Sequence, residues 1–168
     1  MQRRTILMAL AAAPLLGAGA RTLAAGSNGG KSVEPTQTDW KALSDAQWKQ
    51  RLTAAQYDVL RHEGTEPAGS SPLNHEKRPG VFACAGCGLP LFSSEMKYDS
   101  GTGWPSFFTH IPGAFETKRD FRLVWPRTEY HCARCGGHQG HVFSDGPPPT
   151  GKRWCNNGVA LSFLPKDA

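Results

Sequence analysis

Five cysteines carry the first indication of chemistry in this sequence of 168 residues, and four of them fall into two pairs. Cys84 and Cys87 form one CxxC pair and Cys132 and Cys135 form the other, which is the spacing of a tetrahedral thiolate metal site. Cys155 is left without such a partner. We therefore expect four cysteines to hold one structural zinc ion and the fifth to be available as a nucleophile.

Glycines beside both pairs allow each CxxC loop to turn its two sulfurs toward one point. A site of four thiolates is closed to substrate, and it contributes on the order of 10 kcal/mol of binding free energy to folding. Two disulfides are the alternative for an exported protein, but a disulfide within each CxxC loop would be strained and would leave the two loops unconnected. The pattern favours zinc.

The residues around Cys155 are those that activate a thiol. If this segment is extended, alternation puts Arg153, Cys155 and Asn157 on one face. A guanidinium beside a thiol favours the thiolate, which is the nucleophilic form. The imidazoles of His138 and His141 can exchange protons near neutral pH. Together these residues predict a nucleophile with an acid close by.

Other interpretations of the same residues stay open. Cys155 alone can be a small buried apolar residue, and Arg153 can simply pair with a surface acid. His138 and His141 can be core residues or, with Asp145, ligands of a second metal ion. A cysteine hydrolase would use Cys155 and a histidine, whereas a zinc-ribbon binding module without catalysis needs only the two CxxC pairs. The extra cysteine and the histidines favour an enzyme.

The charge of the chain gives little support to nucleic-acid binding. The formal charge is +5, but three of the nineteen basic residues, Arg3, Arg4 and Arg21, lie in the first 25 residues, where there is no acid. The remainder has sixteen basic and fourteen acidic residues. A nucleic-acid-binding domain usually shows a clustered basic face. We therefore expect no nucleic-acid partner.

The first 25 residues have the order of a secretory signal peptide: positive charge, a continuous apolar run from Ile6 to Leu16, then small residues. Arg3-Arg4 resembles the start of a twin-arginine signal, which exports folded proteins. The apolar run is too short to span a bilayer comfortably. We expect an exported, periplasmic protein without stable membrane association, a flexible linker over residues 26–38, and one monomeric domain over residues 39–168.

The elements that must position these side chains are short. Ser44 and Thr53 each begin a helix with a capping-box pattern. From Glu66 onward, short apolar runs are separated by Gly, Pro, Asn and Asp, which is typical of a β-rich domain. The clearest predicted strands are Val81–Cys84, Phe121–Trp125 and Val159–Phe163. The fold class is therefore mainly β.

Longer motifs resemble those of the B-type methionine sulfoxide reductases, from about Asp45 to Phe163. The matching segments include Cys84–Cys87, Ser100–Phe107, Cys132–Cys135, His138–Phe143, Asp145–Pro147 and Arg153–Asn157. The resemblance implies two antiparallel sheets with short N-terminal helices and a structural four-cysteine zinc site away from the active site. It also implies reduction of methionine-R-sulfoxide in proteins and, less well, of the free amino acid.

Carried onto this chain, the resemblance makes Cys155 the nucleophile. Trp104 would form the pocket wall for the S-methyl group of the substrate, with Phe143 as a second apolar wall. The groups that would bind or protonate the sulfoxide oxygen and tune the thiolate are His138, His141, Arg153 and Asn157.

One position departs from many members of that family. They carry a second cysteine between the glycines of a Ser-Gly-x-Gly-Trp motif, and this cysteine reduces the sulfenic acid formed on the nucleophile. Here that position is Thr102. We therefore expect a one-cysteine cycle in which a thioredoxin-like or glutaredoxin-like protein, or a small thiol, reduces Cys155 directly. The substrates would be oxidised proteins that carry methionine-R-sulfoxide.

Overall fold

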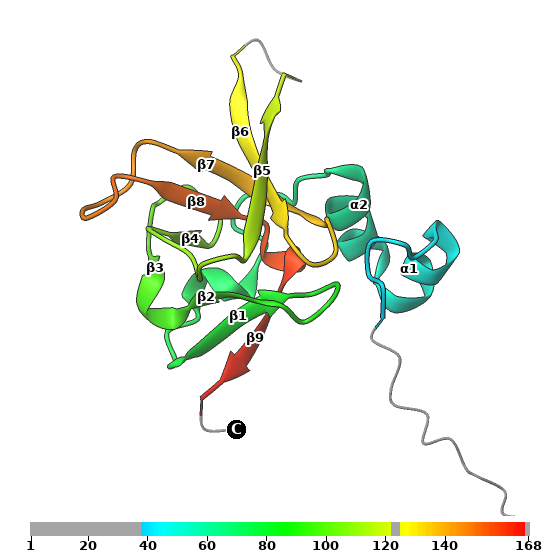
Figure 1. Cartoon of the computed structure of the whole chain (residues 1–168). Helices are drawn as coiled ribbons and strands as arrows, with labels where there is room; N and C mark the ends of the chain where they lie inside the picture. The colour runs from blue at the N-terminus through cyan, green and yellow to red at the C-terminus, as the bar shows by residue number, and fades with distance from the viewer. Residues whose placement is uncertain (1–37, 122–124, 167–168) are drawn as a thin grey trace, which may run out of the picture. The chain divides into compact units, whose positions relative to one another are not determined.

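The computed structural model describes residues 38–121 and 125–166 (Figure 1). The predicted signal peptide over residues 1–25 lies outside the described residues, and so does the predicted linker apart from Thr38. Within the described part of the chain, no helix is both long enough and apolar enough to cross a membrane.

Two short helices open the described part, as the capping patterns predict. They are α1 (Asp45–Arg51) and α2 (Ala54–His62), and both begin with a complete capping box, at Ser44 and Thr53. In each box the hydroxyl accepts from the third helical N–H, and the glutamine there accepts in return from the cap N–H. Trp48, Val59 and Leu60 bury one side of the pair, which fixes the helices against the strands.

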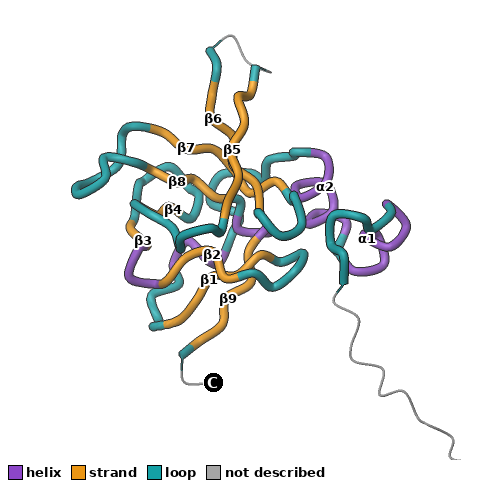
Figure 2. The backbone as a smooth tube through the Cα atoms, in the orientation of Figure 1, coloured by secondary structure: helices purple, strands orange, loops and turns teal. Residues whose placement is uncertain are grey.

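The regular elements in the rest of the described chain are strands and short 3-10 helices, which loops connect (Figure 2). The strands are β1 (Gly80–Cys84), β2 (Pro90–Ser93), β3 (Lys97–Tyr98), β4 (Ser106–Phe107), β5 (Phe115–Asp120), β6 (Arg127–Cys132), β7 (His138–Phe143), β8 (Arg153–Asn156) and β9 (Leu161–Pro165). The 3-10 helices are η1 (Pro72–His75), η2 (Ser94–Met96) and η3 (Gly158–Ala160).

The strands form two antiparallel sheets, which confirms the predicted fold class. The smaller sheet has the order β2-β1-β9, and the larger has the order β3-β4-β8-β7-β6-β5 (Figure 1). Because β8 leads through η3 into β9, the chain passes from the larger sheet to the smaller one directly after the cysteine-bearing strand.

The core lies between the two sheets and is aromatic. Phe107 of the larger sheet stacks on Phe92 of the smaller one, with ring centroids 3.8 Å apart, and meets Phe82 edge-on at 5.1 Å. On the same inner face, the ring of Tyr130 meets that of Trp154 at 4.9 Å. Since side chains alternate along a strand, a residue next to Trp154 in β8 must point away from this core.

Two predicted strands need correction. Phe121 and Trp125 lie outside the strands, with exposed fractions of 70% and 80%, so the predicted strand is wrong at both ends; its central residues, 122–124, lie outside the described residues. Alternating apolar residues mimicked a half-buried strand at the end of the β5–β6 hairpin. The last predicted strand begins two residues late, at Leu161, because η3 occupies Gly158–Ala160.

Candidate active site and metal site

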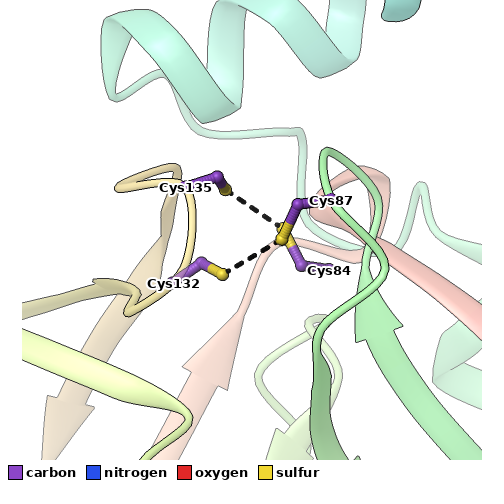
Figure 3. Close-up of side chains that lie close together, drawn as sticks. All are labelled: Cys84, Cys87, Cys132 and Cys135. Carbon is purple, nitrogen blue, oxygen red and sulfur yellow. Dashed lines mark hydrogen bonds between the residues drawn. The ribbon is translucent and has the colours of Figure 1, made fainter. Parts of the chain in front are cut away.

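The four paired cysteines meet at one buried point between the two sheets (Figure 3). Cys84 is the last residue of β1 and Cys132 is the last residue of β6, and the second cysteine of each pair follows in a tight turn. The Sγ atoms of Cys84 and Cys135 are 3.7 Å apart, and those of Cys87 and Cys132 are 3.5 Å apart. All four sulfurs lie within 4.8 Å of one another.

Glycines allow both turns to close. The N–H of Gly88 donates to the carbonyl of Cys84, and the N–H of Gly136 donates to the carbonyl of Cys132, each at 2.8 Å. Both glycines have positive φ values, 72° and 69°, which is the left-handed conformation that other residues seldom adopt. The two CxxC loops therefore have the same hydrogen-bond pattern and present both sulfurs on one side.

The sulfur positions fit a tetrahedral metal ion. With metal–sulfur bonds of about 2.3 Å, a zinc tetrahedron separates its ligands by about 3.8 Å, whereas a disulfide needs about 2.05 Å. All five cysteines are free, so the disulfide alternative finds no support. Among the described residues, this is the one group of three or more His, Cys, Asp and Glu residues that could hold a metal ion.

Cys155 lies on the outer face of the larger sheet, opposite His141. The register pairs His141 of β7 with Cys155 of β8, and Cys155 with Ser106 of β4. On the other side of β7, His141 pairs with Glu129 of β6. Paired residues of adjacent strands share a face, so these four side chains form one row across the sheet.

A pocket opens around this row. Its lining brings together five of the predicted site residues, which come from separate parts of the chain: Trp104, His141, Phe143, Cys155 and Asn157. Thr65, Arg127 and Asn156 complete the lining. The pocket thus joins a thiol and an imidazole to two large apolar rings.

The imidazole of His141 is held by a carboxylate. Its Nε2 atom lies 2.7 Å from Oδ2 of Asp120, and the guanidinium of Arg127 donates to the same oxygen at 2.7 Å. Burial lowers the pKa of His141, and the bond to Asp120 opposes this effect without cancelling it. Since Asp120 occupies Nε2, the second ring nitrogen, Nδ1, is the one left for exchange with a ligand.

His138 has a different environment. It is buried, its Nδ1 atom lies 2.8 Å from a carboxylate oxygen of Glu129, and it lines a second, polar pocket. A bulge in the β6–β7 pairing puts His138 and His141 on one face although they are three residues apart, and their ring centroids are 5.5 Å apart. The ring of His138 therefore packs against the ring of His141 but does not line the pocket of Cys155, whereas His141 does.

Arg153 lies two residues before Cys155 on the same face of β8, as predicted. Its guanidinium binds both carboxylate oxygens of Asp145, at 2.9 and 2.8 Å, and lies 4.3 Å from the ring centroid of Phe143. Burial raises the pKa of the Cys155 thiol, and the charge of Arg153 acts against this rise, as does a hydrogen bond from the hydroxyl of Thr102. Burial is the stronger of these effects in the resting protein.

Asn157 follows β8 and is fixed on both sides of its amide. Its Nδ2 atom donates to the carbonyl of Gln139 at 3.0 Å, and its Oδ1 atom accepts from the N–H of Glu66 at 3.0 Å. The indole of Trp104 donates to the carbonyl of Glu66 at 3.1 Å. The backbone of Glu66 thus holds both Asn157 and Trp104.

Sequence reasoning missed Asp120, Arg127, Glu129 and Glu66. Asp120 and Arg127 form the last pair of the β5–β6 hairpin. Asp120 is the last residue of β5 and Arg127 is the first residue of β6, whereas the sequence pattern predicted a strand over 121–125, so the pairing of these two residues was not predicted. Nothing local in the sequence links Asp120 and Arg127 to His141.

The chain is similar to known proteins over most of the described residues. The family model for the SelR domain matches residues 52–165. Over 123 residues the chain is 50% identical to the peptide methionine sulfoxide reductase MsrB of Agrobacterium fabrum, covering 73% of this chain and 91% of that protein. The MsrB of Leifsonia xyli subsp. xyli is 52% identical over 128 residues, covering 75% and 92%. The mitochondrial methionine-R-sulfoxide reductase B3 of Mus musculus is 48% identical over 127 residues, which are 75% of this chain and 50% of that protein.

Proposed function

Because this chain belongs to the SelR-domain family of MsrB peptide methionine sulfoxide reductases, we propose that it reduces methionine-R-sulfoxide in proteins to methionine, with Cys155 as the nucleophile. One observation carries the proposal. Cys155 and His141 lie directly opposite each other on adjacent strands, in a pocket that also contains the rings of Trp104 and Phe143. A sulfoxide that carries a methyl group needs these three features: a nucleophile, a proton donor and an apolar wall.

We propose that Trp104 and Phe143 receive the S-methyl group. Both rings line the pocket of Cys155, and the Trp104 indole is anchored by its N–H, so it offers a fixed face. Apolar walls for the methyl group direct the sulfoxide oxygen toward the polar side of the pocket. There it would meet His141, Arg127 and Asn157.

Of the two candidate histidines, the geometry favours His141 as the acid. It lines the pocket of Cys155, and Asp120 holds its ring by Nε2, so a proton on Nδ1 can pass to a ligand. His138 is bonded to Glu129 and supports the ring of His141 from behind. We assign His138 to positioning and His141 to proton transfer.

The proposed reaction is a two-electron transfer. The Cys155 thiolate attacks the sulfoxide sulfur while His141 protonates the sulfoxide oxygen, and the sulfur–oxygen bond of the substrate breaks. The attack forms a bond between the two sulfurs, and this bond then breaks as the protonated oxygen is transferred to Cys155. Methionine thus leaves as the thioether, and Cys155 becomes a sulfenic acid. Two electrons have passed from the cysteine sulfur, which is oxidised, to the sulfoxide sulfur, which is reduced.

Regeneration then requires a reductant from outside the chain. The other four cysteines lie together in the buried metal site, and Thr102 occupies the position of the resolving cysteine. We propose that an external thiol attacks the Cys155 sulfenic acid with release of water, and that a second thiol then displaces Cys155 from the mixed disulfide. A thioredoxin-like or glutaredoxin-like protein, or a small thiol, would fill this role.

We further propose that the metal is zinc and that its role is structural. Four buried cysteine sulfurs are the ligands that zinc takes in closed sites, and no position is left for a substrate. The bound ion would supply the link between β1 and β6, which belong to different sheets. We also propose export to the periplasm, on the strength of the order of charge and apolar residues in the first 25 residues.

Turnover of the separated epimers tests the function. Peptide methionine-R-sulfoxide and methionine-S-sulfoxide would be supplied in parallel with dithiothreitol to the wild type and to Cys155→Ser. We expect the wild type to consume the R epimer only and the variant to be inactive. Equal use of both epimers, or an active Ser variant, would contradict the proposal.

A further inference from the structure

Glu66 is a buried acid outside the pocket of Cys155 that the proposed mechanism does not use. It lies in the loop between α2 and η1 and has an exposed fraction of 6%. A carboxylate is rarely buried unless several donors hold it. The partners of Glu66 therefore indicate what it does.

The carboxylate of Glu66 binds the chain directly after the cysteine-bearing strand. Oε1 accepts from the N–H of Gly158, and Oε2 accepts from the N–H of Val159 at 3.0 Å. These are the first two residues of η3. A Cβ atom at Gly158 would lie 1.9 Å from the hydroxyl of Ser71 and 3.1 Å from Oε1, so the close approach of the loop to η3 requires glycine there.

The backbone of Glu66 binds the two sides of the pocket. Its N–H donates to Oδ1 of Asn157 at 3.0 Å, and its carbonyl accepts from the indole N–H of Trp104 at 3.1 Å. Trp104 and Asn157 both line the pocket, and so does Thr65, the residue before Glu66. One residue thus makes four hydrogen bonds to segments that are distant from it in sequence.

We propose that Glu66 is a positioning residue that fixes the Trp104 wall relative to Cys155. The carboxylate ties its loop to η3, which follows the strand of Cys155, and the carbonyl of the same residue holds the indole. If the carboxylate of Glu66 no longer binds η3, the loop can move, and the backbone carbonyl of Glu66 moves with it. The indole of Trp104, which this carbonyl holds, then no longer has a fixed distance from the sulfur of Cys155. The inference rests on the proposed function, because the wall matters only if an apolar group of the substrate is placed against it.

A purely structural role for Glu66 predicts a different result. General destabilisation would lower the fraction of active protein, which reduces kcat and leaves KM unchanged. Loss of the wall position weakens substrate placement and raises KM. The chemistry of Cys155 in the free protein would not change, so its rate of alkylation by iodoacetamide would stay the same.

The test compares full-length wild type with Glu66→Gln, using peptide methionine-R-sulfoxide. The amide keeps the size of the side chain but places an NH2 group against a backbone N–H. The loss of one charge-assisted hydrogen bond predicts a rise in KM of about tenfold with kcat changed by less than about twofold. The alkylation rate of Cys155 is expected to stay at the wild-type value.

A double-mutant cycle shows whether Glu66 acts through Trp104. Trp104→Phe removes the indole N–H, so Glu66→Gln in that background is expected to raise KM by less than about twofold. An equal rise in both backgrounds, an unchanged KM, or a loss confined to kcat would overturn the inference. If Glu66→Gln does not fold, Glu66→Asp, which keeps the charge but is one methylene shorter, takes its place with the same expectations.

The two proposals can fail separately. A wild type without activity on the R epimer refutes the proposed function. An active wild type whose KM is indifferent to Glu66 refutes the positioning role alone.

Discussion

Removing the charge of Arg153 is predicted to raise the pKa of Cys155. Two residues on one face of a strand are about 6.6 Å apart, and unit charges at that separation interact by about 2.5 kcal/mol at an effective dielectric constant of about 20. Asp145 binds the same guanidinium and offsets part of this attraction, although its side chain is 62% exposed and therefore screened. We expect Arg153→Met to raise the pKa of Cys155 by about one unit.

The assay is the rate of Cys155 alkylation by iodoacetamide as a function of pH, followed by mass spectrometry of the peptide that contains Cys155. Only the thiolate reacts, so a rise of one unit makes alkylation about tenfold slower at pH values below the pKa. Arg153→Lys, which keeps the charge, is the matched control and should change the rate less.

Asp145→Asn provides a test of opposite sign. Asp145 raises the pKa of Cys155, so removing its charge should lower that pKa while Arg153→Met raises it. A pKa that is unchanged or lower in Arg153→Met, or a shift in the same direction in both variants, would refute the electrostatic account of the nucleophile.

Three further predictions concern the surroundings of the site. Asp120→Asn removes the negative charge that opposes the lowering of the His141 pKa, so the alkaline limb of the kcat profile should move to lower pH. An unmoved limb would exclude His141 as the acid. Cys132→Ser should lose the metal, seen by elemental analysis, and unfold at much lower urea concentration, because metal binding is coupled to folding; full retention of both would contradict the site. Burial opposes ionisation of Glu129, but its bonds to His138 hold the pKa below its usual value, so this stabilisation is present at neutral pH and lost as pH falls through the lowered pKa. Glu129→Gln should therefore reduce the free energy of unfolding more at pH 7 than at pH values below the lowered pKa, and an equal loss in both ranges would count against this contribution of the carboxylate.

Local rules were enough to predict the cluster of four cysteines and part of the strand that carries Cys155. Two residues between cysteines permit one kind of turn, and the positive φ values of Gly88 and Gly136 show that turn in both loops. Alternation along β8 also placed Arg153 on the face of Cys155, as the register with β7 confirms. The capping boxes of the two helices are local as well, and both were predicted.

The partners of the site residues could not be predicted in this way, because they depend on which strands become neighbours. Period-two alternation puts His138 and His141 on opposite faces, and only the bulge in the β6–β7 pairing brings their rings together. Asp120 reaches His141 across β6, so its role requires knowledge of the strand order. Glu66 contacts residues 38 to 93 positions away, which no local pattern reveals.

The fate of Cys155 after one turnover tests the central claim most directly. The protein would be reduced, freed of reductant, treated with peptide methionine-R-sulfoxide and dimedone, and analysed by mass spectrometry, with Thr102→Cys as a reference in which an internal disulfide can form. We predict a dimedone adduct on Cys155 of the wild type, one methionine formed per chain, and no disulfide. A disulfide between Cys155 and any other cysteine of the wild-type chain, or methionine formed with Cys155 unmodified, would contradict the account.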